Sequence, residues 1–339
     1  MNEVSTFAVG SAPGNAYLTT GSGKAIGQRE DLSDVIERID PTETPLFANA
    51  NKTGCKAIQT DWQVQELQAA DNTNKQAEGF DATFQVLKPT DRLANICQIL
   101  AKTGVVSDTL DAVDKAGRAQ ETAYQKLLKA LEIRRDLEAV LLGTGIKALT
   151  DPRSMSCLKS WISNSVMGAG AGAAPAGDGS NVGTTGTLHA VSETVVADAH
   201  ELAYEDGGKP TLLFNSPKVK RQFSKIGATA GNTGAAVNQL TMSAPRDATV
   251  IGSVGWYLTD FGMLELIIDI FMSNDWQLLL DKRHIDICTL PGRSFKQSDL
   301  AKTGSNKKFM VEWEGTLRIN APKAHAAVRD IDVSLTPVP

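Results

Sequence analysis

Apolar positions along the chain recur with two different periods, and the two periods predict different elements. Residues 108–142 carry apolar side chains every three or four positions, including Leu110, Leu127 and Leu131, and no proline interrupts them. This spacing predicts one long helix over 108–142, ending at Gly143. At about 1.5 Å per residue it would be roughly 45–50 Å long.

Residues 56–67 and 83–100 show an alternating pattern that is typical of β-strands. The stretch between them, 67–82, is polar and rich in turn-forming residues. The pattern predicts an antiparallel ribbon with a long hydrophilic tip. Because a lone two-stranded ribbon is marginal in water, we expect this one to lie on a neighbouring surface.

The N-terminal region has little apolar surface of its own. Residues 1–29 are mainly small or polar and predict an arm that orders only against something else. A short amphipathic helix is predicted before Pro41, since Leu32, Val35, Ile36 and Ile39 share one face. Two apolar residues, 46 and 47, follow it and need a surface to bury against.

The second half mixes helices with strands that are mainly antiparallel, which favours an α+β fold. The elements predicted from their patterns are a flexible loop at 167–187, a helix at 188–205, a strand at 212–214, a helix from Pro217, a second loop at 226–247, two strands turned at 260–262, and a β-rich tail at 309–333.

Composition excludes some function classes. The 339 residues, 42% of them hydrophobic, suffice for one large or two medium cores. A net charge of −5 argues against a strongly basic DNA reader and fits either a soluble protein or one that lines a nucleic-acid container without adhering to it. The four cysteines lack CxxC spacing, so we expect reduced thiols. Without a signal peptide or a run of 18 apolar residues, we expect no membrane partner.

Motifs for catalysis or ligand binding are weak. Residues 21–24, GSGK, suggest a phosphate loop, but Leu18 and Ala25 stand where the motif needs Gly and Ser or Thr. His189 and Glu193 lie one helical turn apart and could bind a metal, although polar side chains on a helix surface are the simpler interpretation. We therefore expect no enzyme activity, no cofactor and no metal.

Several segments, in their order, resemble the major capsid proteins of tailed phages. They are DLSDVIERIDPTETPLF at 31–47, the Trp-Gln pair at 62–63, EIRRDLE at 132–138, and VEWEGTLRINAPKAHAAVRDI at 311–331, which resembles that family's closing strand pair. The resemblance spans about residues 30–335. Two alternatives stay open: an encapsulin-like shell protein of a cellular nanocompartment, and a hydrolase or binding protein whose site is not recognised.

The resemblance implies the α+β capsid fold of phage Hong Kong 97. Mapped onto this chain, residues 1–54 form an N-terminal arm and 55–104 the extended β loop. Residues 105–160 and 290–339 form a peripheral domain with the spine helix 108–142, and 161–289 form an axial domain.

The resemblance also implies self-assembly into pentamers and hexamers, which form the icosahedral shell around phage double-stranded DNA. We expect non-specific contact with that DNA, assembly in the host cytoplasm, and a portal and a decoration protein as partners. Because the chain begins close to the arm, a scaffolding protein would be a separate chain or a segment already removed. The candidate inter-subunit contact residues are Leu46, Phe47, Trp62, Phe80, Phe84 and Leu87.

Overall fold

The computed structural model describes residues 40–338 apart from 83, 85, 114–119, 171 and 230–254. The predicted arm and helix before residue 40, the GSGK motif and most of the loop predicted at 226–247 lie outside the described residues.

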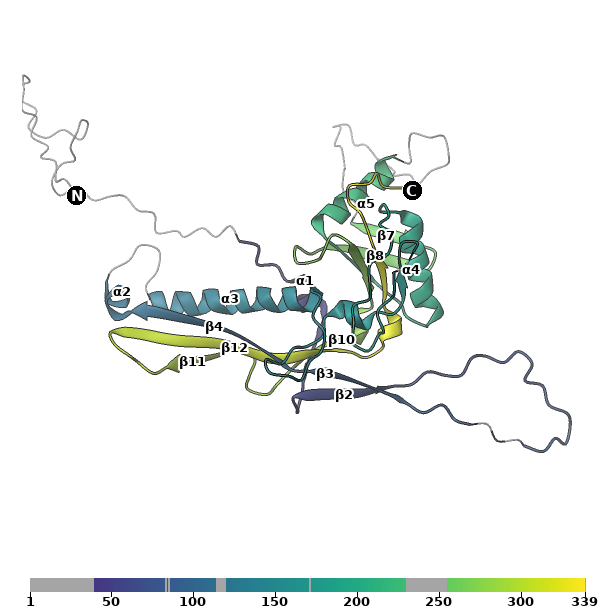
Figure 1. The fold of residues 1–339 in the computed structure, drawn as a ribbon, viewed down its shortest axis with the longest axis horizontal. Coiled ribbons are helices and arrows are strands. Elements are labelled where there is room, and N and C mark those ends of the chain that lie inside the picture. The colour runs from purple at the N-terminus through teal and green to yellow at the C-terminus, as the bar shows by residue number, and fades with distance from the viewer. Residues whose placement is uncertain are drawn as a thin grey trace, which may run out of the picture.

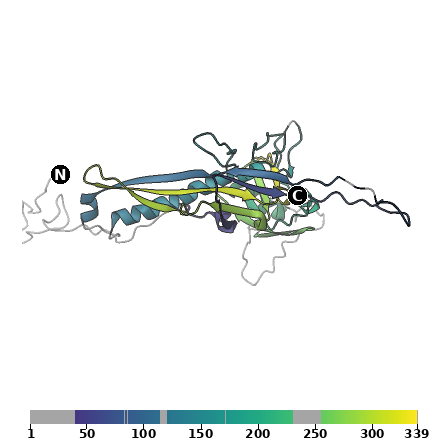
Figure 2. The same cartoon turned by 90° about the horizontal axis from the view of Figure 1, so that it is seen from below.

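A long five-stranded sheet forms the elongated half of the molecule (Figures 1 and 2). Its strands are β1 (Asn51–Gly54), β4 (Gln98–Ser107), β10 (Ile285–Thr289), β11 (Lys296–Leu300) and β12 (Asn306–Ile319). Strand β12 pairs with β4 along one edge, antiparallel, and with β11 and β10 in turn along the other. Strand β1 adds to β10 in parallel.

Helix α3 (Glu121–Leu142) lies along this sheet (Figure 1). Its buried residues Ile133, Leu137 and Leu141 belong to the same core cluster as Phe309 and Trp313 of β12. Burying each such side chain stabilises the fold by about 1.5–3 kcal/mol. This one-sided burial explains the spacing of three and four in the sequence.

The prediction of one continuous helix over 108–142 is wrong at its N-terminal end. A separate short helix, α2 (Asp108–Ala112), ends at Val113, whose backbone is extended with ψ 143°. Helix α3 then begins at Glu121. The apolar spacing continues through the break, so it could not reveal it.

A six-stranded sheet forms the second half of the molecule. Its strand order is β5 (Ser165–Val166), β13 (Ala326–Arg329), β9 (Trp276–Leu280), β6 (Leu212–Asn215), β8 (Gly262–Ile268), β7 (Trp256–Thr259). Leu212 and Phe214 of β6 pack into the core shared with α3, whereas Leu213 between them packs into a second cluster. Helices α4 (Glu193–Glu205) and α5 (Pro217–Thr229) contribute to that second cluster.

The tail connects the two sheets rather than closing one of them. Strands β12 and β13 do not pair with each other; β12 belongs to the long sheet and β13 to the six-stranded sheet. The short helix η4 (Pro322–Ala324) joins them, and η3 (Lys282–His284) joins β9 to β10 in the same way. The sheets therefore divide the chain differently from the predicted domain ranges, since β10 belongs with the long sheet and β13 with the six-stranded one.

Three predictions in the second half are confirmed and two are corrected. Strand β6, helix α5 from Pro217 and the turn between β7 and β8 stand as predicted. The helix predicted at 188–205 begins only at Glu193. Residues in 167–187 are not a free loop, because buried Arg329 donates hydrogen bonds to the carbonyls of Ala173 and Thr184.

The predicted ribbon is present and projects from the body (Figure 1). Strands β2 (Gln59–Val64) and β3 (Asp91–Ile96) pair antiparallel, from Gln59 opposite Ile96 to Val64 opposite Asp91. The paired part is shorter than the alternation predicted. Two further short helices, α1 (Pro45–Asn49) and η1 (Leu158–Trp161), both contact α3.

Candidate subunit-contact surfaces

The outer part of the ribbon exposes large apolar side chains. Its described residues between 65 and 90 form no strand. Phe84 is 100% exposed, Leu87 86% and Phe80 54%. Apolar side chains gathered in this way are typical of an interaction surface.

Trp62 lies at the base of the ribbon and contacts its own chain. Its ring packs against Trp161 of η1, with centroids 5.1 Å apart. Leu93, opposite Trp62 on β3, packs against the same core. Trp62 thus holds the ribbon on its own subunit. This corrects the expectation that Trp62 is an inter-subunit contact residue.

Leu46 is likewise corrected, because its side chain is 1% exposed and lies in the core beneath α3. Phe47 is half-buried and meets Phe295 edge to face, with centroids 6.2 Å apart. The Arg134 guanidinium lies 5.0 Å from the Phe47 ring centroid. Both residues therefore fasten α1 to the body of the molecule.

Charged contacts tie the ribbon to the six-stranded half. Glu66 accepts from Lys323 at 2.7 Å and from Lys88 at 2.8 Å. These hydrogen bonds, the one from Lys323 first, lower the pKa of Glu66 to about 2. Since all three side chains are partly exposed, the pairs contribute at most about 1 kcal/mol each. The ribbon base, η4 and the end of α4 border a groove of about 1060 Å³.

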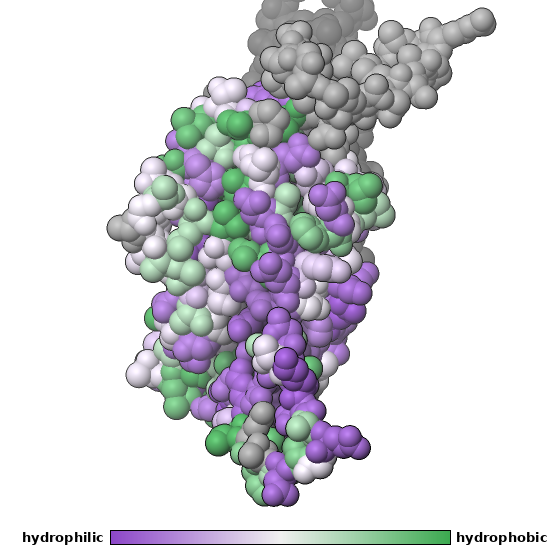
Figure 3. Space-filling view, turned by 90° about the vertical axis from the view of Figure 1, so that its right-hand side faces the viewer, coloured by the Kyte–Doolittle hydropathy of each residue, from purple (hydrophilic) through white to green (hydrophobic). Residues whose placement is uncertain are grey.

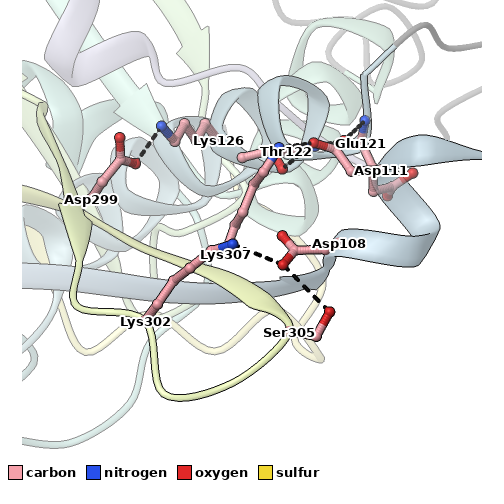
Figure 4. Close-up of polar contacts among 9 residues, drawn as sticks. All are labelled: Asp108, Asp111, Glu121, Thr122, Lys126, Asp299, Lys302, Ser305 and Lys307. Carbon is pink, nitrogen blue, oxygen red and sulfur yellow. Dashed lines mark hydrogen bonds and ion pairs between the residues drawn. The ribbon is translucent and has the colours of Figure 1, made fainter.

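A second polar cluster joins the start of α3 to the β11–β12 hairpin (Figure 4). The ion pairs are Lys126–Asp299 at 2.7 Å, Lys302–Asp108 at 2.8 Å and Lys307–Asp111 at 2.5 Å. Asp111 Oδ1 also accepts from the backbone N–H groups of Glu121 and Thr122, which satisfies the otherwise unpaired start of α3. The hydrogen bond from Lys307 is the main reason why the pKa of Asp111 falls to about 2.

Sequence reasoning missed this cluster. It placed Asp108 and Asp111 inside one continuous helix, where an Asp has no capping role. A signal was nevertheless present, since Asp favours helix starts and three Lys follow in 302–308. The spacing alone did not show that these two segments, almost 200 positions apart, meet.

The two residues considered as metal ligands, His189 and Glu193, are engaged in other hydrogen bonds. Both ring nitrogens of His189 lie within 2.8 Å of backbone carbonyls, those of Ala190 and Arg329. Glu193 accepts a hydrogen bond from the Tyr257 hydroxyl at 2.8 Å. Across the described ranges, no three His, Cys, Asp or Glu side chains are grouped to hold a metal ion. Of the helices in that part of the chain, none is both long and apolar enough to span a membrane.

Comparison with known sequences decides the family. The profile of the SU10 major capsid proteins matches residues 15–332. The chain belongs to this family. The capsid protein is also 25% identical to the major capsid protein of Escherichia phage Phieco32 over 333 residues, which cover 88% of this chain and 93% of the relative.

Solved structures confirm the expected fold. The capsid of cyanophage A-1(L) matches with a TM-score of 0.58 at 12% identity, over 90% of this chain and 97% of that one. The SrpI encapsulin of Synechococcus elongatus PCC 7942 matches with a TM-score of 0.55 at 11% identity, over 90% and 95%. The capsid protein therefore has the α+β fold of the Hong Kong 97 type. The encapsulin is a relative in fold only, and the family match identifies the chain as the major capsid protein of a tailed phage.

Proposed function

We propose that this capsid protein assembles with copies of itself into hexamers and pentamers that close into an icosahedral shell around phage double-stranded DNA. Assembly would take place in the host cytoplasm, with a scaffolding protein and a portal as partners and the DNA contacted non-specifically. A decoration protein is a further partner. The phage G structure, which matches with a TM-score of 0.53, pairs its major capsid proteins with decoration proteins.

The two halves of the molecule suit different places in such a shell. The long sheet with α3 would be the peripheral domain, and the six-stranded sheet with α4 and α5 would be the axial domain near the capsomer centre. The ribbon would be the extended loop, lying on a neighbouring subunit. The two sheets share one continuous core, so each subunit would enter the shell as a single body.

The exposed apolar side chains of the ribbon carry this proposal. Phe84, Val86 and Leu87 are between 86% and 100% exposed on a segment that projects from the body. In a lone subunit they gain nothing from burial. Covering each fully with a neighbouring chain would contribute about 1.5–3 kcal/mol, before the entropy of ordering the ribbon is subtracted.

The test compares the wild-type chain with F84D/L87D by light scattering and negative-stain microscopy. Wild-type protein is expected to form closed shells or capsomer rings, and F84D/L87D to remain folded but unassembled. The control N72D/Q76E adds the same two negative charges at exposed polar positions of the same loop and should assemble. Normal shells from F84D/L87D would contradict the role of the ribbon.

A further inference from the structure

Helix α4 presents an acidic face. Asp198, Glu201 and Glu205 are exposed and are separated by three and four positions, so they lie on one side of the helix. The opposite side, with Val196, Ala199 and Ala203, is buried in the second core cluster. Within the described part of the chain, none of the three carboxylates forms an ion pair with another residue.

Helix α5 presents a basic face with the same spacing. Lys218, Arg221 and Lys225 are exposed and separated by three and four positions, and α5 contains no Asp or Glu. Its other side packs into the same core cluster through Val219 and Phe223. Lys218 and Arg221 form no ion pair with any described residue of their own chain.

The two faces do not meet within one subunit. In Figure 1, α4 runs down the right-hand side of the six-stranded sheet, whereas α5 lies at its upper end. Figure 3 looks onto the right-hand side of the molecule in Figure 1, where hydrophilic side chains gather along the middle and lower part of the surface. One chain thus carries two helix faces of opposite charge and equal spacing, and among the described residues Asp198, Glu201 and Glu205 of one face and Lys218 and Arg221 of the other have no ion-pair partner.

We propose that the acidic face of α4 docks against the basic face of α5 on a second copy of this chain in the same capsomer. This inference rests on the proposed function, since it needs subunits arranged in a ring. Two different complementary faces make a head-to-tail contact, which closes into a ring when its rotation allows. With equal spacing, the charges face each other along about 10 Å of both helices.

Complementary charges on the two helix faces determine which neighbour docks more than they increase the affinity of the contact. Exposed ion pairs are individually weak, but like charges brought face to face are strongly unfavourable. The contact would therefore fix which neighbour docks and in which register. Affinity would come from the ribbon and other apolar contacts.

Charge reversal on either face tests the proposal. The variants are D198K/E201K on α4, K218E/R221E on α5, and the four substitutions combined. Each reversal alone is expected to lower the yield of capsomers and shells in sedimentation at least about tenfold, because like charges then face each other. The combined variant restores opposite charges and should return to within about twofold of wild type. The control K56E/K282E makes the same charge change as K218E/R221E at exposed positions off both helices and should assemble normally.

The outcomes separate this inference from the proposed function. Normal assembly of both single-face variants, or no recovery in the combined variant, overturns the docking of α4 on α5 while shells of the wild-type protein still stand. If wild-type protein forms neither rings nor shells, the proposed function fails and the inference falls with it. Circular dichroism and thermal midpoints show that each variant is folded, and the milder D198N/E201Q should lose assembly by a smaller factor.

Discussion

Glu138, near the end of α3, accepts a 2.5 Å hydrogen bond from the backbone N–H of Leu46, which lies 92 positions earlier in the chain. The second Glu138 oxygen accepts from the N–H of Phe47 at 2.9 Å. Both N–H groups belong to the first turn of α1, which has no partners for them within the helix. One buried carboxyl group thus caps α1 and fastens it to the spine helix.

A second buried carboxyl, Asp269 at the end of β8, lies beside Glu138. Burial, and then the interaction with Asp269, raise the pKa of Glu138 to about 8, and burial raises the pKa of Asp269 as well. Two adjacent buried carboxylates repel each other, so the pair retains a proton near neutral pH.

The pair makes stability fall as pH rises. The pKa of Glu138 is 4.5 unfolded and about 8 folded, so the native state binds the extra proton between these values. Its contribution is fully present below 4.5 and is lost towards pH 8, by up to about 1.4 kcal/mol per pH unit. Urea unfolding between pH 5 and 8 should show this slope, and E138Q should flatten it. E132Q, at a half-buried position of the same helix where Glu132 pairs with Lys129, should keep it; an unchanged slope in E138Q would refute the assignment.

Gly104 of β4 lies directly opposite Phe309 of β12, and the phenyl ring covers it. A Cβ at position 104 would be 2.4 Å from the Phe309 Cζ. Because Phe309 is 1% exposed and has little room to move, we expect G104A to destabilise the protein by about 1–3 kcal/mol. Denaturant midpoints check this. G255A, where the added methyl group meets open space, is the control, and equal midpoints for the two variants would contradict the packing.

Sequence patterns predicted the elements that are determined by residues close to one another in the chain. The ribbon followed from alternation on both sides of a polar stretch. Helix α5 followed from Pro217, and the Ser216 hydroxyl caps the helix by accepting from the N–H of Val219 at 3.3 Å. The break at Val113 could not be predicted in this way. The start of α3 depends on Asp111 and its pairing with Lys307, a contact between residues 196 positions apart.

The candidate contact residues also differ in whether distant parts of the chain cover them. Phe84 and Leu87 are exposed on the ribbon, as an inter-subunit contact requires. Leu46 and Trp62 looked similar in the sequence, since an apolar residue beside a polar segment does not reveal what covers it. Their partners, α3 and Trp161, are about 90–100 positions away, and only the fold brings them together.

Arg329 holds the glycine-rich segment 167–187 against the six-stranded sheet. Its side chain is 2% exposed, lies 4.7 Å from the Trp276 ring centroid, and donates to Ala173 O at 2.9 Å and Thr184 O at 3.0 Å. The carbonyls of Ala173 and Thr184 also accept each other's backbone N–H groups, so R329M removes only the two charge-assisted hydrogen bonds and should destabilise the protein by about 2–4 kcal/mol. Limited proteolysis should then cleave within 167–187. R92M, at an exposed ribbon position, should not cause cleavage there, and resistance of R329M would count against this role.

Three of the four thiols, those of Cys55, Cys97 and Cys288, cluster where the ribbon joins the long sheet. The sulfurs of Cys55 and Cys97 are 3.6 Å apart, and burial raises the pKa of Cys97 from 9.0 to about 12. At a given pH this leaves on the order of a thousandfold fewer thiolates to react. Folded protein treated with iodoacetamide should therefore keep Cys97 unmodified by mass spectrometry, whereas protein in urea should be alkylated. An exposed thiol introduced by A82C is the control, and equal rates at positions 82 and 97 in folded protein would show that the cluster is open to solvent.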